Sequence, residues 1–389
     1  MLANLSNVLV VFVLARSLSS SDYGSYTQLM AIFLFVSITG TALSVNIVRS
    51  VRFGSVGDIG EWRQAFLESL RKSLLPTLGL SVGLVYLLHY ELPGLAVLPT
   101  TLILLGGLVW MYLCAVRGFL QAERDYQILA NSFLLESCLR VILVLGGARF
   151  GLVIVAAGYF TMALILSFHS SRKRWGAVVK VTSQSPIGIL RRSIPTIVSY
   201  FALISLMYLD IVIIGHRLPS QRGSYGAISQ MSKFVVYGAF ALASLVVAEV
   251  ERPGAKKTRW RYMSVAIAGL YVAMLGVVLI GVKNFGGQLI SWSFGASYMS
   301  CIGALVPLTV GMGALGVTIL VANSSLGLGN SWSVGVVAVG AVSTGIYVWG
   351  NSKSVEMLAR ADMWAQLTLM CILCVVSFTI SYRGAREGR

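Results

Sequence analysis

Charged residues are scarce in this sequence. Only 11% of its 389 residues are Asp, Glu, Lys or Arg, whereas 57% are hydrophobic. A typical soluble domain carries about a quarter charged residues, and a soluble fold of this length could not hide so much apolar surface in one core. The composition therefore excludes a soluble globular protein.

Histidine and cysteine are also scarce, and neither gathers into a cluster. His89, His169 and His216 are far apart along the chain, which disfavours a metal site or a catalytic base. Cys371 and Cys374 form a CxxC motif in an apolar run without a nearby His or acidic residue, so we expect small core residues there. The sequence predicts no metal, no cofactor and no enzymatic activity.

The charge that is present is mainly basic. Lys and Arg number 30 against 14 Asp and Glu, which gives a net charge of +16. Such an excess can indicate nucleic-acid binding. Here, however, the basic residues lie in short connections between apolar runs, which is the pattern of cytoplasmic loops in membrane proteins. We therefore expect no nucleic-acid partner.

Long apolar runs recur along the whole chain. A helix needs ~17–25 apolar residues to cross the hydrocarbon of a bilayer. We expect twelve membrane-spanning helices, at residues 2–15, 26–48, 74–90, 95–116, 128–147, 152–169, 194–214, 226–248, 263–282, 300–322, 332–350 and 364–382. No connection is long enough for an inserted soluble domain, so the predicted function lies within the membrane.

The distribution of Lys and Arg among the connections predicts the topology. The connections after the even-numbered runs, together with the C-terminal segment, contain 21 of them, and those after the odd-numbered runs contain 7. Positive residues are retained on the cytoplasmic side. Both termini are therefore expected in the cytoplasm, and the basic stretch at 172–174 is expected to contact anionic membrane lipid.

A short internal repeat divides the twelve runs into two sets of six. Gly24-Ser25-Tyr26 follows the first run and Gly223-Ser224-Tyr225 follows the seventh, and both are expected on the same side of the membrane. Parallel repeats of this kind occur in transporters whose two lobes enclose a central cavity. We expect an all-α integral membrane protein with a six-helix lobe at 1–169, a cytoplasmic linker at 170–193 and a second six-helix lobe at 194–389.

Four regions carry a resemblance to a known family. They are Leu14-Ala15-Arg16-Ser17-Leu18 with Asp22-Tyr23-Gly24-Ser25-Tyr26, Val45-Asn46-Ile47-Val48-Arg49, Asp210-Ile211-Val212-Ile213-Ile214-Gly215, and Phe294-Gly295-Ala296-Ser297-Tyr298. Together they resemble the polysaccharide flippases (O-antigen and exopolysaccharide type) of the multidrug/oligosaccharidyl-lipid/polysaccharide exporter superfamily. The resemblance covers nearly the whole chain. One departure is that the first helix begins at Met1, without the polar or amphipathic lead-in usual in the family.

The resemblance implies a function. Flippases of this family move an oligosaccharide linked to a polyprenyl pyrophosphate from the inner to the outer leaflet of the bacterial cytoplasmic membrane by alternating access, for surface polysaccharide biosynthesis. The lipid-linked oligosaccharide would be the substrate, with H+ or Na+ as the coupling ion if transport is ion-coupled. Other polysaccharide assembly proteins would be partners.

Ionisable groups inside apolar runs are costly in lipid and normally face a cavity or one another. Glu136 and Arg140 lie four residues apart in the fifth run, one helical turn apart on one face. They are either a structural ion pair or a site in which Arg140 binds a pyrophosphate or acidic sugar while Glu136 exchanges a proton. Asp210 and Lys233 lie in consecutive runs at similar depth. They form either a salt bridge or a pair that switches partners when substrate or a cation enters.

Two further arginines, Arg49 and Arg117, lie at the cytoplasmic ends of the second and fourth runs. A guanidinium group donates two hydrogen bonds at once to a phosphate, so both are candidates for drawing in the pyrophosphate, although each could equally be a cytoplasmic anchor. The substrate-binding candidates are thus Arg49, Arg117, Arg140 and Lys233, and the ion-coupling or ion-pair candidates are Glu136 and Asp210.

Two other functions stay open for the same sequence. An ion-coupled exporter of cationic drugs would share the fold, but it favours an acidic cavity, whereas the embedded groups here are two acids and two bases. A membrane-embedded glycan polymerase or ligase needs a sizeable outer loop with catalytic residues. The outer connections of this sequence are short and gather no cluster of His or carboxylate residues.

Overall fold

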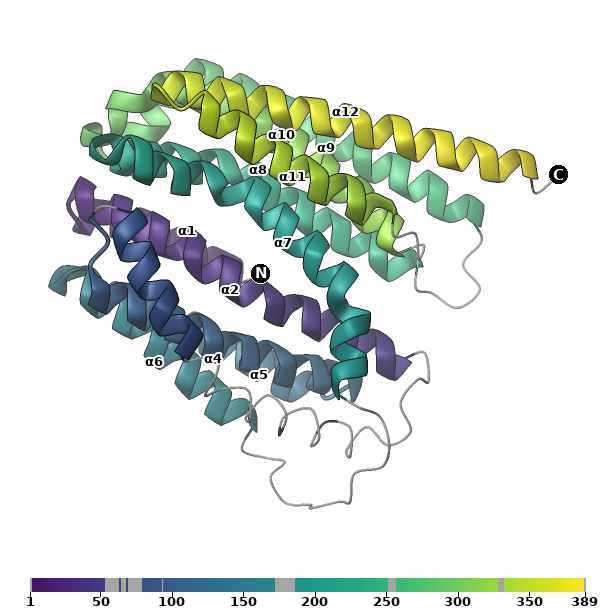
Figure 1. Cartoon of the computed structure of the whole chain (residues 1–389), viewed down its shortest axis with the longest axis horizontal. Coiled ribbons are helices and arrows are strands. Elements are labelled where there is room, and N and C mark those ends of the chain that lie inside the picture. The colour runs from purple at the N-terminus through teal and green to yellow at the C-terminus, as the bar shows by residue number, and fades with distance from the viewer. Residues whose placement is uncertain are drawn as a thin grey trace. The chain divides into compact units, whose positions relative to one another are not determined.

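The structure is a computed structural model of the whole chain, and it describes residues 2–52, 63, 68, 79–92, 94–171, 186–250, 257–327 and 332–387. Within these ranges the side chains are described except those of 2–6, 49–52, 186–193, 244–250, 257–264, 326–327 and 381–387. Helices are the only regular secondary structure in the described residues. Twelve main helices follow one another in the order that the sequence predicts (Figure 1).

The chain divides into two compact units, Met1–Phe201 and Ala202–Arg389. The boundary falls inside α7 (Pro186–Arg217), so this helix contributes to both units. Residues 172–185, which make up much of the predicted linker, lie outside the described residues. The division into lobes at 1–169 and 194–389 therefore stays a prediction.

Unit 1 is formed by the first six main helices and the first half of α7. Its elements before α7 are α1 (Leu2–Ser17), α2 (Ser20–Arg52), a helix at 79–91, α4 (Val97–Ala122), α5 (Tyr126–Leu139), the π-helix η1 (Arg140–Leu145), the 3-10 helix η2 (Ala148–Phe150) and α6 (Leu152–Ser171). Polar side chains begin two of these helices. Ser19 Oγ accepts a hydrogen bond from the Asp22 N–H at 3.1 Å, and Asp125 Oδ1 accepts one from the Ile128 N–H at 3.4 Å.

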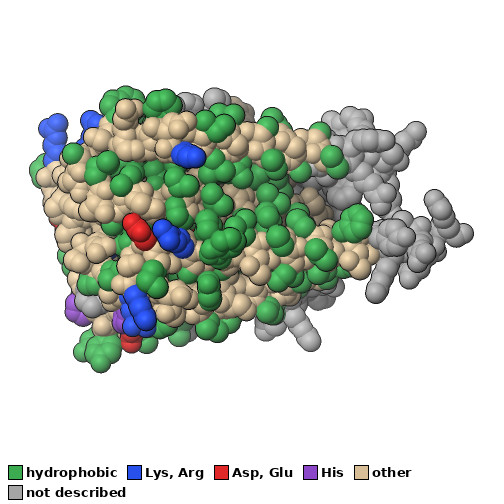
Figure 2. Space-filling model, turned by 90° about the horizontal axis from the view of Figure 1, so that it is seen from above, with side chains coloured by type: hydrophobic (Ala, Val, Ile, Leu, Met, Phe, Trp, Pro, Cys, Tyr) green, Lys and Arg blue, Asp and Glu red, His purple; other side chains and the backbone are tan. Residues whose placement is uncertain are grey.

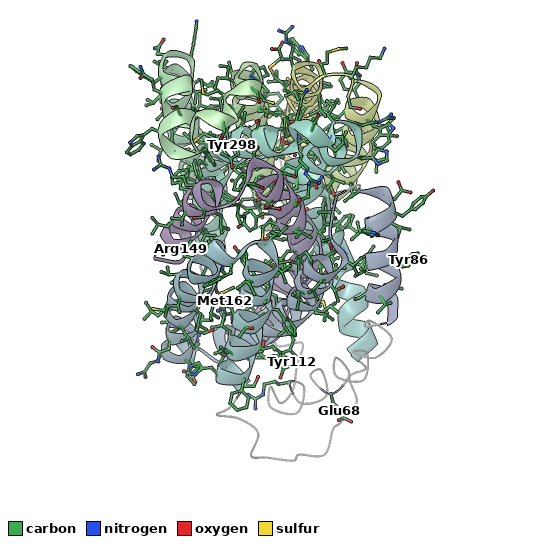
Figure 3. All side chains as sticks on the ribbon, turned by 90° about the vertical axis from the view of Figure 1, so that its left-hand side faces the viewer. Glu68, Tyr86, Tyr112, Arg149, Met162 and Tyr298 are labelled. Atoms are coloured by element: carbon green, nitrogen blue, oxygen red, sulfur yellow. The ribbon has the colours of Figure 1, made fainter. Side chains whose placement is uncertain are left out.

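The core of unit 1 is built by α4, which packs against α2 on one side and α6 on the other. The approach of α2 to α4 depends on glycine, because a Cβ on Gly40 would lie 2.6 Å from Met111 Cα and one on Gly118 would lie 2.8 Å from Ser44 Cα. Small residues allow helix backbones to approach closely in lipid, where dispersion contacts rather than the hydrophobic effect drive association. Figure 3 shows Met162 of α6 among these helices, and this side chain is fully buried.

Unit 2 follows the same plan. After the second half of α7 it contains the 3-10 helix η4 (Pro219–Gln221), α8 (Arg222–Val250), α9 (Lys257–Ser293), the 3-10 helix η5 (Ala296–Ala304), α10 (Leu305–Gly327), α11 (Trp332–Gly350) and α12 (Val355–Glu387). Its central helix α10 packs against α8 and α12, as α4 packs against α2 and α6 in unit 1. The second, fourth and sixth helices of each set of six thus form the core, which is the arrangement that a parallel repeat predicts.

The outer surfaces of the helices are apolar. Val265 and Val277 of α9 are 73% and 72% exposed, and the face shown in Figure 2 carries many hydrophobic side chains and few charged ones. In the described residues, nine helices are long and apolar enough to cross a membrane. Of the other predicted spans, α1 and the helix described at 79–91 are shorter, and α8 carries Gln230 and Lys233. The chain is a multi-pass membrane protein, as the sequence predicts.

One sequence-based expectation is wrong. Cys371 and Cys374 lie exposed on α12, so they are not the small core residues that we expected. The twelfth helix contains the span predicted at 364–382 but already begins at Val355, since the Ser354 hydroxyl caps it by accepting a hydrogen bond from the Met357 N–H at 3.2 Å. The earlier start brings Asp362 into the helix.

Candidate functional site

An ion-paired group of three residues, here called the arginine cluster, lies inside unit 1. Its members are Arg117, Glu136 and Arg140, which are 7%, 5% and 5% exposed. Arg117 Nη1 donates to Glu136 Oε2 at 2.8 Å, and Arg140 Nη2 donates to Glu136 Oε1 at 2.5 Å. One carboxylate therefore serves two guanidinium groups, and the arginine cluster has a net charge of +1.

The local fold explains how the three side chains meet. Glu136 lies in the last turn of α5, and Arg140 begins the π-helix η1 one turn later, so both side chains lie on the same face. Single π-helical turns widen the helix and are frequent at functional sites. Arg117 comes from α4, which packs against α5.

Arg117 is held from several directions. Its Nε and Nη2 donate to Ser132 Oγ at 3.0 and 2.9 Å, and Nη2 also donates to the Ser132 carbonyl oxygen at 3.2 Å. The guanidinium group lies 4.3 Å from the ring centre of Phe133 and 5.6 Å from that of Trp110, within the range of cation–π attraction. Such a set of contacts fixes the group in position and offsets the cost of burying its charge.

Arg140 has fewer partners than Arg117. Its Nη1 donates to Asn7 Oδ1 of α1, but its Nε finds no acceptor among the described residues. It acts electrostatically on Tyr26 and Tyr159, whose hydroxyl oxygens are 3.1 Å apart. Arg140 is the member of the arginine cluster with hydrogen-bonding capacity left over.

Aromatic rings form a row through the interior of unit 1, each ring lying next to the one before it. The ring centres of Tyr26 and Tyr159 are 6.4 Å apart, those of Tyr159 and Phe33 are 6.0 Å apart, and those of Phe33 and Trp110 are 5.7 Å apart. The row ends at Arg117, beside Trp110. Aromatic faces are suited to stacking on the apolar faces of sugar rings as well as to packing against one another.

A second buried group, here called the aspartate cluster, lies inside unit 2 and consists of Asp210, Lys233, Asp362 and Gln366. Asp210 Oδ2 accepts hydrogen bonds from the Tyr225 hydroxyl at 2.9 Å and the Ser229 hydroxyl at 2.7 Å. Asp210 Oδ1 lies 3.6 Å from Lys233 Nζ. Lys233 is fully buried, with Nζ 4.2 Å from the ring centre of Tyr208.

The other half of the aspartate cluster comes from α12. Gln366 Nε2 donates to the Leu206 carbonyl oxygen at 2.9 Å and to Asp362 Oδ1 at 3.4 Å. Asp362 is 3% exposed, and Gln366 links it to α7, the helix that carries Asp210.

The structure can be compared with the sequence-based candidates. The predicted contacts between Glu136 and Arg140 and between Asp210 and Lys233 are both present. Arg117 was expected at a cytoplasmic helix end, but it is buried and ion-paired. The side chain of Arg49 lies outside the described residues.

The sequence reasoning missed Asp362 and Ser132. It counted two embedded acids and two bases, whereas Asp362 and the candidate Arg117 are buried as well. Asp362 would have stood out as an acid inside a membrane helix if the predicted helix had begun at its cap residue, Ser354. Ser132 has no such signal, because its role depends on how α4 and α5 pack.

Metal binding finds no support in the described part of the chain, where no three His, Cys, Asp or Glu residues gather into a possible metal site. Chemically, the two clusters are different. The arginine cluster can attract an anion, and the aspartate cluster can hold a cation.

Neither a protein-family model nor a curated protein sequence matches this chain. The apolar surface and the helix packing define a multi-pass membrane protein, and solved structures show which fold it has. The inward-facing form of a multidrug resistance MATE family transporter of the MOP superfamily aligns with 97% of this chain and 94% of its own, at 15% identity and a TM-score of 0.76. The outward-facing form of such a transporter aligns with 100% of this chain and 94% of its own, at 16% identity and a TM-score of 0.65.

A flippase shares the same fold. Lipid II flippase MurJ, in an inward closed conformation, aligns with 97% of this chain and 86% of its own, at 13% identity and a TM-score of 0.74. Identities this low show the fold alone. The chain therefore has the fold of the MATE transporters and of MurJ, which confirms the predicted fold class.

Proposed function

We propose that this protein is a transporter that moves a lipid-linked oligosaccharide with an anionic pyrophosphate head group from the inner to the outer leaflet by alternating access. The observation that carries the proposal is the arginine cluster, where Arg117 and Arg140 share the single carboxylate of Glu136 in the interior of unit 1. The fold supports transport, because solved transporters of both drugs and lipid II have it.

Arg140 is the residue best prepared to meet a phosphate. Its Nε is buried without an acceptor among the described residues, and an unpaired buried donor costs about 1–3 kcal/mol. A pyrophosphate oxygen would supply that acceptor through a charge-assisted hydrogen bond, and its charge would be balanced by the surplus positive charge of the cluster. Glu136 would then keep Arg117 paired while Arg140 turns to the substrate.

The rest of the proposal follows from this role. The aromatic row that ends at Trp110 and Arg117 would offer ring faces to the sugars next to the pyrophosphate. The polyprenyl tail would stay in lipid while the head group crosses the membrane through the protein. We place the protein in a bacterial cytoplasmic membrane, as its resemblance to the polysaccharide flippases implies. Both termini would lie in the cytoplasm, because Lys and Arg concentrate in alternate connections.

The test is movement of a fluorescent polyprenyl-pyrophosphate oligosaccharide in proteoliposomes, read with a membrane-impermeant quencher. The wild-type protein should move the lipid, and R140Q should slow it about tenfold or more, since a hydrogen bond to a charged group contributes ~1.5–3 kcal/mol. R360Q is the matched control, because Arg360 also pairs with a Glu four residues earlier but is 67% exposed. Lack of movement by the wild-type protein, or full activity of R140Q, would contradict the proposal.

The second candidate function is export of cationic drugs. Two buried acidic side chains in unit 2, Asp210 and Asp362, favour it, and a drug transporter is among the solved structures with this fold. Proteoliposomes loaded with a cationic dye separate the two functions. Export of the dye along a proton or sodium gradient, with the lipid-linked oligosaccharide left in place, would replace the first proposal with this one.

A further inference from the structure

Basic residues gather at one end of unit 2, where the predicted topology gives no reason for them. The connections after the odd-numbered runs contain 7 Lys and Arg residues, and four of these lie in the connections after the seventh and eleventh runs: Arg217, Arg222, Lys353 and Arg360. On the predicted topology these connections face away from the cytoplasm, whereas Lys and Arg are normally retained on the cytoplasmic side. The positive charge at this end therefore needs another explanation.

The last turns of α7 and α11 meet at one tryptophan ring. The guanidinium group of Arg217 lies over the ring of Trp349, 4.2 Å from its centre. The ring of His216 is stacked on the same tryptophan, with ring centres 5.1 Å apart and an angle of 29° between the planes. Both helices end on the left-hand side of Figure 1. The cation–π contact thus anchors an arginine side chain at the surface of the protein.

Arg217 keeps its hydrogen-bond donors for another molecule. Its side chain is exposed, and within the described part of the chain it makes no hydrogen bond and no ion pair. The ring of Trp349 attracts the positive charge but offers no oxygen acceptor to the N–H groups. Arg360, by comparison, pairs with Glu356 at 3.9 Å. An anchored guanidinium group without an acid is suited to bidentate binding of a phosphate.

The surface next to Arg217 is apolar and faces lipid. Val339, Val342 and Ile346 lie on one face of α11 and are 68%, 65% and 71% exposed. Trp349 continues this face at the end of the helix and is 42% exposed. Tryptophan residues mark the boundary between the hydrocarbon and the head groups of a bilayer. Arg217, which lies against Trp349, is therefore at the depth of the lipid phosphates.

We propose that this end of unit 2 binds an anionic phospholipid, with its phosphate held by Arg217 and its acyl chains along the exposed face of α11. The ligand is a lipid because the phosphate donors and the apolar face meet at Trp349. It is an anionic lipid because the exposed Lys353, in the connection after α11, adds a second positive charge that no acid of the described residues pairs with. The site does not depend on which substrate the protein moves.

The test is quenching of tryptophan fluorescence by lipids with brominated acyl chains, measured on the purified full-length protein in neutral detergent. W349F identifies the part of the signal that comes from Trp349. Brominated phosphatidylglycerol should quench Trp349 at about fivefold lower mole fraction than brominated phosphatidylcholine, as expected for one basic residue at the head group. R217Q should remove this preference. R149Q, which removes an exposed arginine of η2 in unit 1, should keep it.

Several results would overturn the proposal. Equal quenching of wild-type Trp349 by the two lipids would show that only unselective lipid surrounds this face. A preference that survives R217Q, or one that R149Q removes as well, would show a general effect of net charge. Inorganic phosphate in excess, at constant ionic strength, should leave the quenching by phosphatidylglycerol unchanged, and relief of the quenching would show that the site takes a free anion. Because Arg217 is exposed, R217Q should fold, which circular dichroism checks.

Discussion

Neutralising Glu136 should destabilise the protein more than any comparable change at its surface. The substitution E136Q keeps the size of the side chain but leaves Arg117 and Arg140 buried next to each other without the carboxylate that they share. Breaking a buried ion pair by removing one partner costs ~3–5 kcal/mol. Because two guanidinium groups lose their partner here, we expect a loss at the upper end of that range.

The chain supplies a closely matched control. Glu356 and Arg360 are also a Glu–Arg pair four residues apart on one helix, but their side chains are 62% and 67% exposed and their charged atoms are 3.9 Å apart. E356Q should cost about 0.3–0.5 kcal/mol, the usual size for an exposed pair of this kind. Equilibrium unfolding of both variants in mixed detergent micelles gives the comparison. If E136Q were no less stable than E356Q, the arginine cluster would not be the electrostatic centre of unit 1.

Two further substitutions test the packing of unit 1 and the aspartate cluster. G40V should destabilise the protein by about 1–3 kcal/mol, because its side chain would overlap Met111 of α4, whereas G276V, at a position with open space around it, should be nearly neutral in the same unfolding measurement. Y225F removes one of the two hydroxyl groups that donate to Asp210, so it should cost ~1.5–3 kcal/mol, while Y86F at an 82% exposed position should cost nothing measurable.

The membrane-spanning part of the fold could be predicted because lipid imposes a simple rule. Every spanning segment must be apolar and long enough, so the helices appear as long apolar runs in the sequence. The rule fails where helices extend beyond the hydrocarbon. At the start of α12, Glu356, Arg360 and Asp362 lower the hydropathy, although the backbone is already helical from Val355. Hydropathy indicates whether a helical segment is surrounded by lipid or by water, whereas a cap residue such as Ser354 marks where the helix begins.

The candidate site could be predicted only where its contacts are local or lie in consecutive helices. The pairing of Glu136 with Arg140 follows from helix geometry alone. The contact between Arg117 and Glu136 joins two helices, and its existence depends on how α4 rotates about its axis when it packs against α5. No periodic pattern in the sequence fixes that rotation. For the same reason the sequence did not predict that Gln366 would link Asp362 of α12 to Leu206 of α7.

Arg117 raises the question of whether the arginine cluster needs a guanidinium group or only a positive charge at that position. R117K keeps the charge but loses the planar guanidinium group. In the wild-type protein this group donates to Glu136 through Nη1 and to Ser132 through Nε and Nη2. One ammonium group cannot replace all of these hydrogen bonds, so R117K should lose about 1–3 kcal/mol of stability.

If Arg117 positions Glu136 while Arg140 meets the substrate, the transport rate per folded molecule of R117K should fall far less than that of R140K. Measuring lipid movement and unfolding on the same preparations separates the two roles. Equal losses of transport in R117K and R140K, at equal amounts of folded protein, would show that both guanidinium groups contact the head group.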